Sequence, residues 1–458
     1  MEVFFVPVGD KYLLYAPLHR LSAVLNQSAL RSLRDALRTN ADSPPALSAI
    51  VQKLRDNALP MPGARRGALR DGLPPQPMFL GLIPTRGCNL GCPYCDFAAP
   101  KTRSAVMDVA LARDAIDAYL RLLAEGGHTR GEVHFFGGEP FFAPRVVHFA
   151  VEYAAARAAA AGITLRFEAT SNGLYSAARA RWIASRFDTV VLSLDGPADI
   201  QERQRPSING QAAAAAVIRS AEIFSESDVE LVLRACVTHQ SVQRMPEIAA
   251  WFAQKFRPST VCFETLKQSP FSTASAFLPP DPYDFARYFD RAAQILAAYG
   301  IQTVFSGADL RGVRASFCPV GKDALIVSPD GAVAACYLLE KDWQQSGLDM
   351  HLGWLRAGHF ALDAAAIERA RGLAVENKPL CANCLCRLHC AGGCHVSHDT
   401  ARAPGHFDEV CIQTRLITTA ALLRQNGQHA LADAWLADGA ALHATAAQSS
   451  DRLIRGKR

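Results

Sequence analysis

Three cysteines near the start of the chain have the spacing of a metal site. Cys88, Cys92 and Cys95 form a Cys-x3-Cys-x2-Cys triplet directly after the strand-like run FLGLIP. Thiolates bind iron–sulfur clusters and zinc, and a cubane iron–sulfur cluster normally takes four of them. Three thiolates would therefore leave one iron open to another ligand. A zinc knuckle is the alternative, but no fourth cysteine or histidine follows before His128.

A second set of cysteines lies toward the C-terminus. Eight of the 13 cysteines in the chain lie between Cys318 and Cys411. The N-terminal run MEVFFVPVGDKYLLY is acidic and lacks the basic start of a signal peptide, so we expect a cytoplasmic location. In a reducing compartment, clustered cysteines are typical of metal ligands and not of disulfides. Zinc is the alternative metal here also, because Cys-x2-Cys pairs bind it readily.

Composition limits the classes of partner. The chain has 458 residues, 50% of them hydrophobic and 20% charged, which is typical of a globular enzyme of two to four domains. The 48 basic and 43 acidic residues give a net charge of +5 that is scattered over the whole length. We therefore expect no nucleic-acid partner, which would need a basic patch. We also expect no membrane partner, since no apolar run reaches about 18 residues.

Strand-like and helical runs alternate from residue 78 to about residue 304. The strand-like runs are FLGLIP, EVHFF, ITLRFEATS, TVVLSLD, VELVLRACV, TVCFET and IQTVF. The runs between them, such as DVALARDAIDAYLRLLAE, are rich in alanine and amphipathic. This alternation predicts a parallel sheet with crossover helices, either a barrel or a doubly wound sheet. Chemistry then belongs to the loops after the strands, where the cysteine triplet lies.

Three further motifs follow the next predicted strands. Gly137-Gly138-Glu139-Pro140 follows EVHFF, Ser171-Asn172-Gly173 ends ITLRFEATS, and Ser193-Leu194-Asp195-Gly196-Pro197 includes the end of TVVLSLD. A cluster of glycine and proline by itself is usually a turn. The position of each motif after a strand is what makes the set informative.

Together these motifs resemble the radical S-adenosylmethionine (SAM) superfamily, with Tyr94 as the aromatic residue before the third cysteine. The resemblance covers residues 78 to about 305 and implies an α/β fold with a partial (β/α)6 TIM-like barrel. It implies a 4Fe–4S cluster on Cys88, Cys92 and Cys95 whose open iron binds SAM. One electron would then cleave SAM to methionine and a 5′-deoxyadenosyl radical, which abstracts hydrogen from the substrate. An electron donor such as a flavodoxin or ferredoxin is implied as well.

The resemblance also implies which residues contact SAM. The backbone of Gly137 and Gly138 and the Glu139 carboxylate would hold the methionine amino group, because glycines let the backbone approach a ligand closely. Ser193 and Arg205 would contact the SAM carboxylate, which suits a guanidinium fork. The other expected cofactor-binding residues are Tyr94, Ser171, Asn172 and Asp195. Arg234 is either a further contact or a surface residue.

The cysteine-rich region resembles the SPASM domain, a C-terminal extension of many radical SAM maturases, over about residues 306–415. By that resemblance one auxiliary 4Fe–4S cluster is held by Cys318, Cys336 and Cys394. The second is held by Cys381, Cys384, Cys390 and Cys411, which gives three clusters in the chain. The first group lacks a fourth ligand, and Cys386 is either that ligand or a spectator thiol.

SPASM proteins work mainly on peptides and proteins, so the resemblance implies an oxidoreductase that matures a ribosomally made peptide (RiPP). Residues 1–76 loosely resemble a leader-recognising module, which would capture a precursor by strand addition, or else they are a cap on the barrel. The alternatives are an anaerobic sulfatase-maturing enzyme that makes formylglycine and a small-molecule radical SAM dehydrogenase. Sulfatase-maturing relatives carry an aspartate where this chain has Tyr337, and they have an eighth cluster cysteine.

The sequence thus divides into four expected segments. They are an N-terminal strand and helix module (1–76), the radical SAM core (77–305), the SPASM domain (306–415) and a C-terminal helix with a solvated tail (416–458). No catalytic acid or base is assigned. Tyr337, His389 and His395 are candidates because they lie near the cluster cysteines in the sequence.

Overall fold

The computed structural model describes residues 2–39, 44–56, 58–61, 79–95, 97, 105–268, 270–322, 324–398, 406–447 and 451–453. The expected boundary at residues 76–77 lies outside these ranges. Two sheets make up the framework, one of 11 strands and one of four. None of the helices in the described ranges is long and apolar enough to cross a membrane.

Seven parallel strands form most of the large sheet, and they are the seven that the sequence predicts. They are β4 (Leu80–Leu82), β5 (Arg130–Phe135), β6 (Thr164–Ser171), β7 (Thr189–Ser193), β8 (Glu230–Val237), β9 (Thr260–Thr265) and β10 (Gln302–Val304). They lie side by side in chain order, and the large sheet has free edges at β10 and β14 (His359–Leu362) within the described residues. The predicted partial barrel is confirmed.

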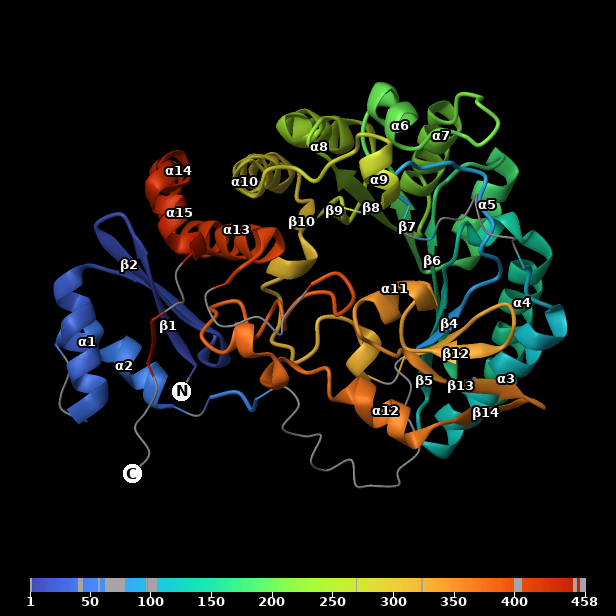
Figure 1. Cartoon of the computed structure of the whole chain (residues 1–458), viewed down its shortest axis with the longest axis horizontal. Helices are drawn as coiled ribbons and strands as arrows, with labels where there is room; N and C mark the ends of the chain where they lie inside the picture. The colour runs from blue at the N-terminus through green and yellow to red at the C-terminus, as the bar shows by residue number, and fades with distance from the viewer. Residues whose placement is uncertain are drawn as a thin grey trace.

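Helices between these strands cover the outside of the curved sheet (Figure 1). They are α3 (Val109–Glu125), α4 (Pro144–Ala160), α5 (Ala177–Arg186), α6 (Ala198–Gln204), α7 (Ala214–Ser225), α8 (Met245–Lys255) and α10 (Pro282–Ala298); the short helix α9 (Pro270–Ala274) belongs to the segment after β9. Alternate strand residues such as Val133 and Phe135 are buried in the hydrophobic core. The residues between them, such as Glu132 and His134, line a polar cavity of about 340 Å³ on the other face. One face of the sheet thus carries the core, and the other is open to polar groups.

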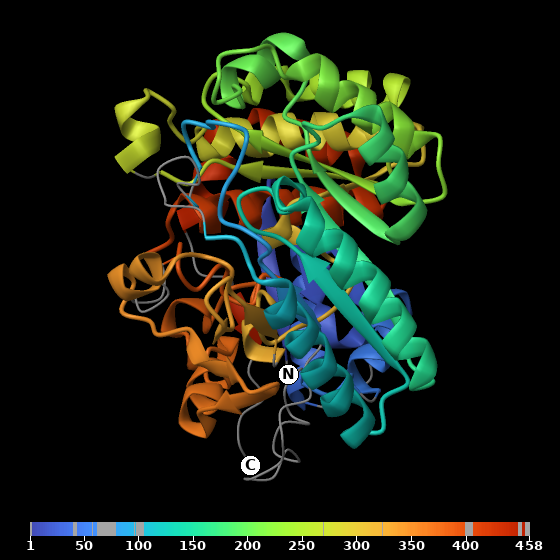
Figure 2. The same ribbon diagram turned by 90° about the vertical axis from the view of Figure 1, so that its right-hand side faces the viewer.

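The cysteine-rich region continues the same sheet. β11 (Leu325–Val327) pairs in parallel with β4, and β12 (Ala332–Ala334), β13 (His351–Arg356) and β14 follow as antiparallel neighbours. Two short helices, α11 (Glu340–Gln345) and α12 (Ala364–Arg371), pack beside these strands. Between residues 375 and 398 the backbone forms only short 3-10 turns and bends. The cysteines from Cys381 to Cys394 therefore lie on turns, whereas Cys411 lies in a helix. The cysteine-rich region, drawn in orange, lies beside the strands and helices of the barrel (Figure 2).

The small sheet combines the two ends of the chain. It holds β1 (Val3–Val8), β2 (Lys11–Ala16), β3 (Leu21–Leu25) and, beside β1, the C-terminal strand β15 (Asp451–Leu453). Helices α1 (Gln27–Thr39) and α2 (Ser48–Arg55) cover one face of the sheet with a core of their own. The sequence indicated only the first two strands, because β3 and β15 are short and lack clear alternation.

Over its described residues, the C-terminal segment forms three helices and a strand, whereas the sequence indicates a single helix. It contains α13 (Glu409–Gln425), α14 (His429–Ala437) and α15 (Gly439–Ala447), followed by β15. Helix α13 lies between α10 and the small sheet (Figure 1). The expected solvated tail is wrong for residues 451–453, which pair with β1; the last five residues lie outside the described ranges.

Candidate metal and cofactor site

The cysteine triplet lies on the loop after β4, as its position in the sequence indicates. Burial raises the pKa of Cys88 to about 11 and that of Cys92 to about 12; Cys95 adds to both shifts, and Cys88 adds to that of Cys92. The three thiols therefore lie close enough to repel one another once ionised. Such thiols lose their protons only when a cation binds, and this donor set fits an iron–sulfur cluster.

Two glycines after β5 pack directly against the backbone that leads into this loop. The amide of Gly138 donates to Thr85 O over 3.2 Å, and the amide of Glu139 donates to Gly87 O over 2.9 Å. A Cβ atom on Gly137 would lie 2.3 Å from Thr85 O, and one on Gly138 would lie 2.3 Å from Gly87 O. Close approach of a ligand is the reason expected for these glycines. In the structure, the contact between the two loops already requires them.

The Glu139 carboxylate is buried and fixed from three sides. Its Oε1 accepts from Ser171 Oγ at 2.9 Å and from the Phe141 amide at 3.1 Å, while Oε2 accepts from the Asn172 amide at 2.7 Å. Burial raises the pKa of this carboxyl to about 7 despite the three donors. A carboxylate in this environment is stabilised when a cationic group binds beside it.

Asn172 joins the loop after β6 to the cysteine loop. Its Nδ2 donates to Cys88 Sγ over 3.4 Å and to Asn89 Oδ1 over 2.8 Å. Asn89 Nδ2 in turn donates to Leu174 O over 2.8 Å. The expected residues Ser171 and Asn172 are thus brought to the triplet together with Glu139.

A buried ionic group after β7 holds the aromatic residue of the triplet. The Tyr94 hydroxyl donates to Asp195 Oδ2, which also accepts from Gln204 Nε2 at 2.8 Å. Asp195 Oδ1 accepts from the Cys236 amide at 2.9 Å, and Arg205 Nε lies 3.0 Å from Oδ2. Since its oxygens already have four partners, Asp195 positions Tyr94 and Arg205. This differs from the direct cofactor contact expected of it.

Ser193 lies at the end of β7 in register with Arg234 on β8, and Arg234 is in register with Cys262 on β9. Residues in register on neighbouring strands share a face of the sheet. Arg234 is exposed there. Of the two interpretations left open for Arg234, this register favours a role beside Ser193.

The first auxiliary group comprises Cys318, Cys336 and Cys394. Burial raises the pKa of Cys318 to about 11 and that of Cys336 to about 12, and the Cys394 thiol raises both further. The Val320 amide donates to the Cys318 thiol and the Leu338 amide to the Cys336 thiol, and both bonds favour the thiolates. This donor set fits an iron–sulfur cluster that has three protein thiolates.

The second auxiliary group lines one small cavity. Its members Cys381, Cys384, Cys390 and Cys411 surround that cavity with Cys386, His398, Phe407 and Arg415. Arg415 Nη1 donates to Cys384 Sγ over 3.4 Å. The Cys386 thiol also donates to Cys384, which lowers the pKa of Cys384. Four thiols around one cavity fit a four-cysteine cluster site.

Sequence reasoning missed one residue of this second group. His398 Nε2 lies 3.3 Å from Cys411 Sγ, and its Nδ1 lies 2.5 Å from Asp408 Oδ2. Its spacing from the cysteines carries no recognised motif, so only the contact identifies it.

The three acid or base candidates are all held neutral. Burial lowers the pKa of His389 and of His395 to about 3, and it raises the pKa of Tyr337. The Tyr337 hydroxyl oxygen has no hydrogen-bond partner in the described residues, and its ring contacts Phe136 just before the two glycines. Near pH 7 both imidazoles are therefore uncharged, and Tyr337 keeps its hydroxyl proton.

Comparison with known proteins identifies the domain that carries the cysteine triplet. Residues 82–252 match the sequence profile of the Radical SAM superfamily. A serine-type anaerobic sulfatase-maturating enzyme of Klebsiella aerogenes is 24% identical over 366 residues, which are 75% of this chain and 84% of that relative.

Solved structures share the fold. Native anSMEcpe with bound AdoMet superposes with a TM-score of 0.58 at 18% identity, over 76% of this chain and 99% of that chain. SuiB of Streptococcus suis bound to S-adenosylmethionine superposes with a TM-score of 0.53 at 15% identity, over 90% and 98%. Residues 82–252 are therefore a radical SAM domain, and the chain is an enzyme. Domains of this superfamily use a 4Fe–4S cluster and SAM.

Proposed function

We propose that the chain is a radical SAM/SPASM maturase that modifies a ribosomally made peptide, installing a crosslink or an oxidation. The observation that carries the proposal is the presence of two further cysteine groups, of three and four thiols, beside the radical SAM domain. When bound, the cluster and SAM supply a 5′-deoxyadenosyl radical that abstracts hydrogen from the substrate. We adopt the division into residues 1–76, 77–305, 306–415 and 416–458 as part of the proposal.

The residues of the radical SAM domain take the following roles in the proposal. Cys88, Cys92 and Cys95 hold the SAM-binding cluster, and Glu139 accepts the amino group of SAM. Its three hydrogen bonds keep the carboxylate in one orientation. Arg205, which Asp195 holds, and Ser193 are assigned to the SAM carboxylate.

The two auxiliary groups each hold a 4Fe–4S cluster in this proposal, for a total of three. Metal analysis tests this part directly. The anaerobically purified chain should contain iron and acid-labile sulfide sufficient for three clusters, and little zinc. Mostly zinc with little sulfide would contradict it.

A peptide substrate is supported by the small sheet. One edge of this sheet, at β1, is already paired with β15. Within the described ranges, β3 pairs with β2 alone, so its outer edge is free to add a strand. Proteins of the same fold have been seen with peptides: SuiB bound to precursor peptide SuiA, and anSMEcpe bound to the Cp18Cys peptide.

The same sheet explains why deletion of residues 1–76 is a poor test. Phe4, Val6 and Tyr15 belong to the main hydrophobic core, and Glu2 Oε1 lies 3.4 Å from Arg387 Nη1 in a buried ion pair. Deletion would expose that core and unpair Arg387. Single substitutions in β3 leave these contacts in place.

We therefore expect a pair of proline variants, Ala23→Pro and Val24→Pro, to separate recognition from folding. Neighbouring strand residues point their amides to opposite sides, so one variant removes a free-edge donor and the other weakens the pairing with β2. Precursor affinity, measured by fluorescence anisotropy, should fall at least tenfold in one variant with little change in Tm. Unchanged affinity in both variants would exclude recognition at this edge.

The substrate itself can be captured from the native host. The Cys88/Cys92/Cys95→Ala variant, which should bind but not turn over, serves as anaerobic bait, and bound polypeptides are identified by intact mass. Incubation of that polypeptide with the active chain and SAM should yield a product lighter by the hydrogen lost. No mass change despite SAM cleavage would contradict a role as its maturase.

Formylglycine formation on a sulfatase is the second candidate, since the curated relatives that match this chain are sulfatase-maturating enzymes. A neutral Tyr337 does not supply a carboxylate base, which favours the first candidate. A hydrazide probe separates the two, because it labels the aldehyde of formylglycine but not a carbon–carbon or carbon–sulfur crosslink.

A further inference from the structure

Lys378 is a buried cation in the cysteine-rich region. The residue is 7% exposed, and its Nζ donates to Ala391 O over 3.0 Å. No carboxylate in the described ranges forms an ion pair with it. Burial of an ammonium group without a counter-charge is unfavourable, so a negative charge held nearby would stabilise its charged form.

The titratable groups whose negative charge acts on Lys378 are thiols of both auxiliary groups. Burial lowers the pKa of Lys378, whereas ionised Cys381 and Cys390 of the second group raise it. Cys318 and Cys394 of the first group raise it as well. Lys378 thus lies within electrostatic reach of both groups, and it is placed there by the turn that carries Cys381.

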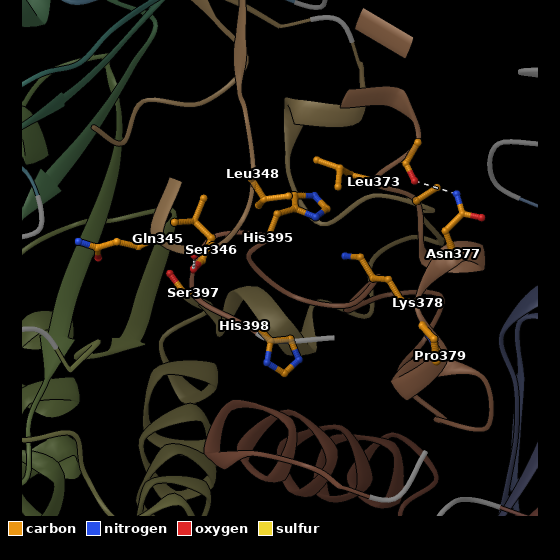
Figure 3. A pocket seen from close by; sticks show the side chains of 13 residues that line it. Gln345, Ser346, Leu348, Leu373, Asn377, Lys378, Pro379, His395, Ser397 and His398 are labelled. Carbon is orange, nitrogen blue, oxygen red and sulfur yellow. Dashed lines mark hydrogen bonds between the residues drawn. The ribbon is translucent and has the colours of Figure 1, made fainter. Parts of the chain in front are cut away.

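The loop between the two groups leaves room for this side chain. Gly392, between Cys390 and Cys394, has a φ of +82°, and a Cβ atom there would lie 2.3 Å from Lys378 Cδ and 2.6 Å from Nζ. Figure 3 shows the Lys378 side chain extending into a cavity of about 790 Å³, with its nitrogen on the side of His395. The path of the side chain thus depends on a glycine that lies between a cysteine of the second group and one of the first.

Other buried cations in the region have different surroundings. Arg314 also lies near Cys318 and Cys390, but its guanidinium donates to the carbonyl oxygens of Phe317 and His389 and has Asp309 nearby. Arg415 donates to Cys384 in the second group. Of these three cations, Lys378 is therefore the one whose positive charge depends most on negative charge in the two cysteine groups.

We propose that Lys378 is a shared counter-ion of the two auxiliary clusters. Its charge stabilises the reduced, more negative state of each cluster and so raises both reduction potentials. Because one ammonium acts on both, loss of its charge should lower both potentials together. The inference rests on the proposed function, since it requires a cluster in each group.

The test measures the potentials and not the activity. The background is the full chain with Cys88/Cys92/Cys95→Ala, so that only auxiliary clusters give a signal. Lys378→Met and Lys378→Gln remove the charge, and Lys378→Arg keeps it. Lys53→Met, which replaces an exposed lysine on α2, is the control. Redox titrations at fixed pH, followed by electron paramagnetic resonance, report the two midpoint potentials.

We expect both neutral variants to lower both midpoint potentials, while Lys378→Arg and Lys53→Met stay near the parent value. A shift of one cluster alone, no shift, or a shift with Met but not with Gln would overturn the shared-charge role. Loss of iron from both neutral variants with full iron in Lys378→Arg would support it; loss from all three would overturn it. A parent that holds zinc in place of clusters would instead show that the proposed function has failed.

Discussion

The SAM-site loops and the cysteine-rich region use the same kind of ligand but are built differently. Around the triplet, loops that follow neighbouring parallel strands hydrogen-bond to one another, as the Glu139–Asn172 and Asn172–Cys88 contacts show. Between residues 375 and 398 the cysteines lie on short turns with no strand beneath them. The first site is thus held together by hydrogen bonds between loops of the sheet, whereas the cysteines of the second lie on turns without such a framework.

The buried cations show the same difference. Arg205 in the first region is paired with the carboxylate of Asp195, so its charge is balanced by the protein itself. Lys378 in the second region has no carboxylate partner in the described ranges, and the charges that raise its pKa are those of thiols.

The largest effect should come from replacing one cysteine by alanine in each region. Cys88→Ala should reduce formation of 5′-deoxyadenosine to background, because the SAM-binding cluster loses one of three thiolates. Cys384→Ala should lose the iron of one auxiliary cluster but still cleave SAM in the absence of substrate. Iron content and product chromatography check both variants. Retained cleavage in Cys88→Ala would refute the assignment of the triplet.

An intermediate effect should follow from adding a methyl group where the loop after β5 contacts the backbone that leads into the cysteine triplet. Gly138→Ala places a methyl group 2.3 Å from Gly87 O, so the loops must separate, at a cost of about 2 kcal/mol. We expect weaker SAM binding by calorimetry and a lower Tm. Gly439→Ala, whose methyl group meets no atom within 4 Å, is the matched control and should lower neither. Equal behaviour of the two variants would argue against packing of the loops as the reason for the glycine.

The smallest effect concerns the pH dependence of stability. Burial raises the pKa of Glu139 from 4.5 to about 7, so the folded chain takes up a proton that the unfolded chain lacks at intermediate pH. The free energy of unfolding should therefore fall as pH rises from about 4.5 to about 7, and then level off.

Glu139→Gln should flatten this part of the profile, as measured by urea unfolding of the SAM-free chain at each pH. The exposed Glu125→Gln variant should leave the profile unchanged. If Glu139→Gln kept the parent slope, Glu139 would not be the group that titrates.

The sequence by itself determined the radical SAM domain and most of the barrel. The cysteine spacings and the alternation of runs such as EVHFF with alanine-rich helices are local properties, and the seven predicted parallel strands are all present. Ser171, Asn172 and Glu139 could be predicted as neighbours of the triplet because the ends of neighbouring parallel strands meet at one edge.

Only the tertiary structure decided which residues act on one another across the chain. Pairing of β15 with β1 joins residues more than 440 positions apart, and Asp195 takes its partners from Tyr94, Gln204 and Cys236. Lys378 appears in the sequence as one more lysine beside a proline. Its significance depends on burial and on two groups of thiols that fold around it, which no local pattern encodes.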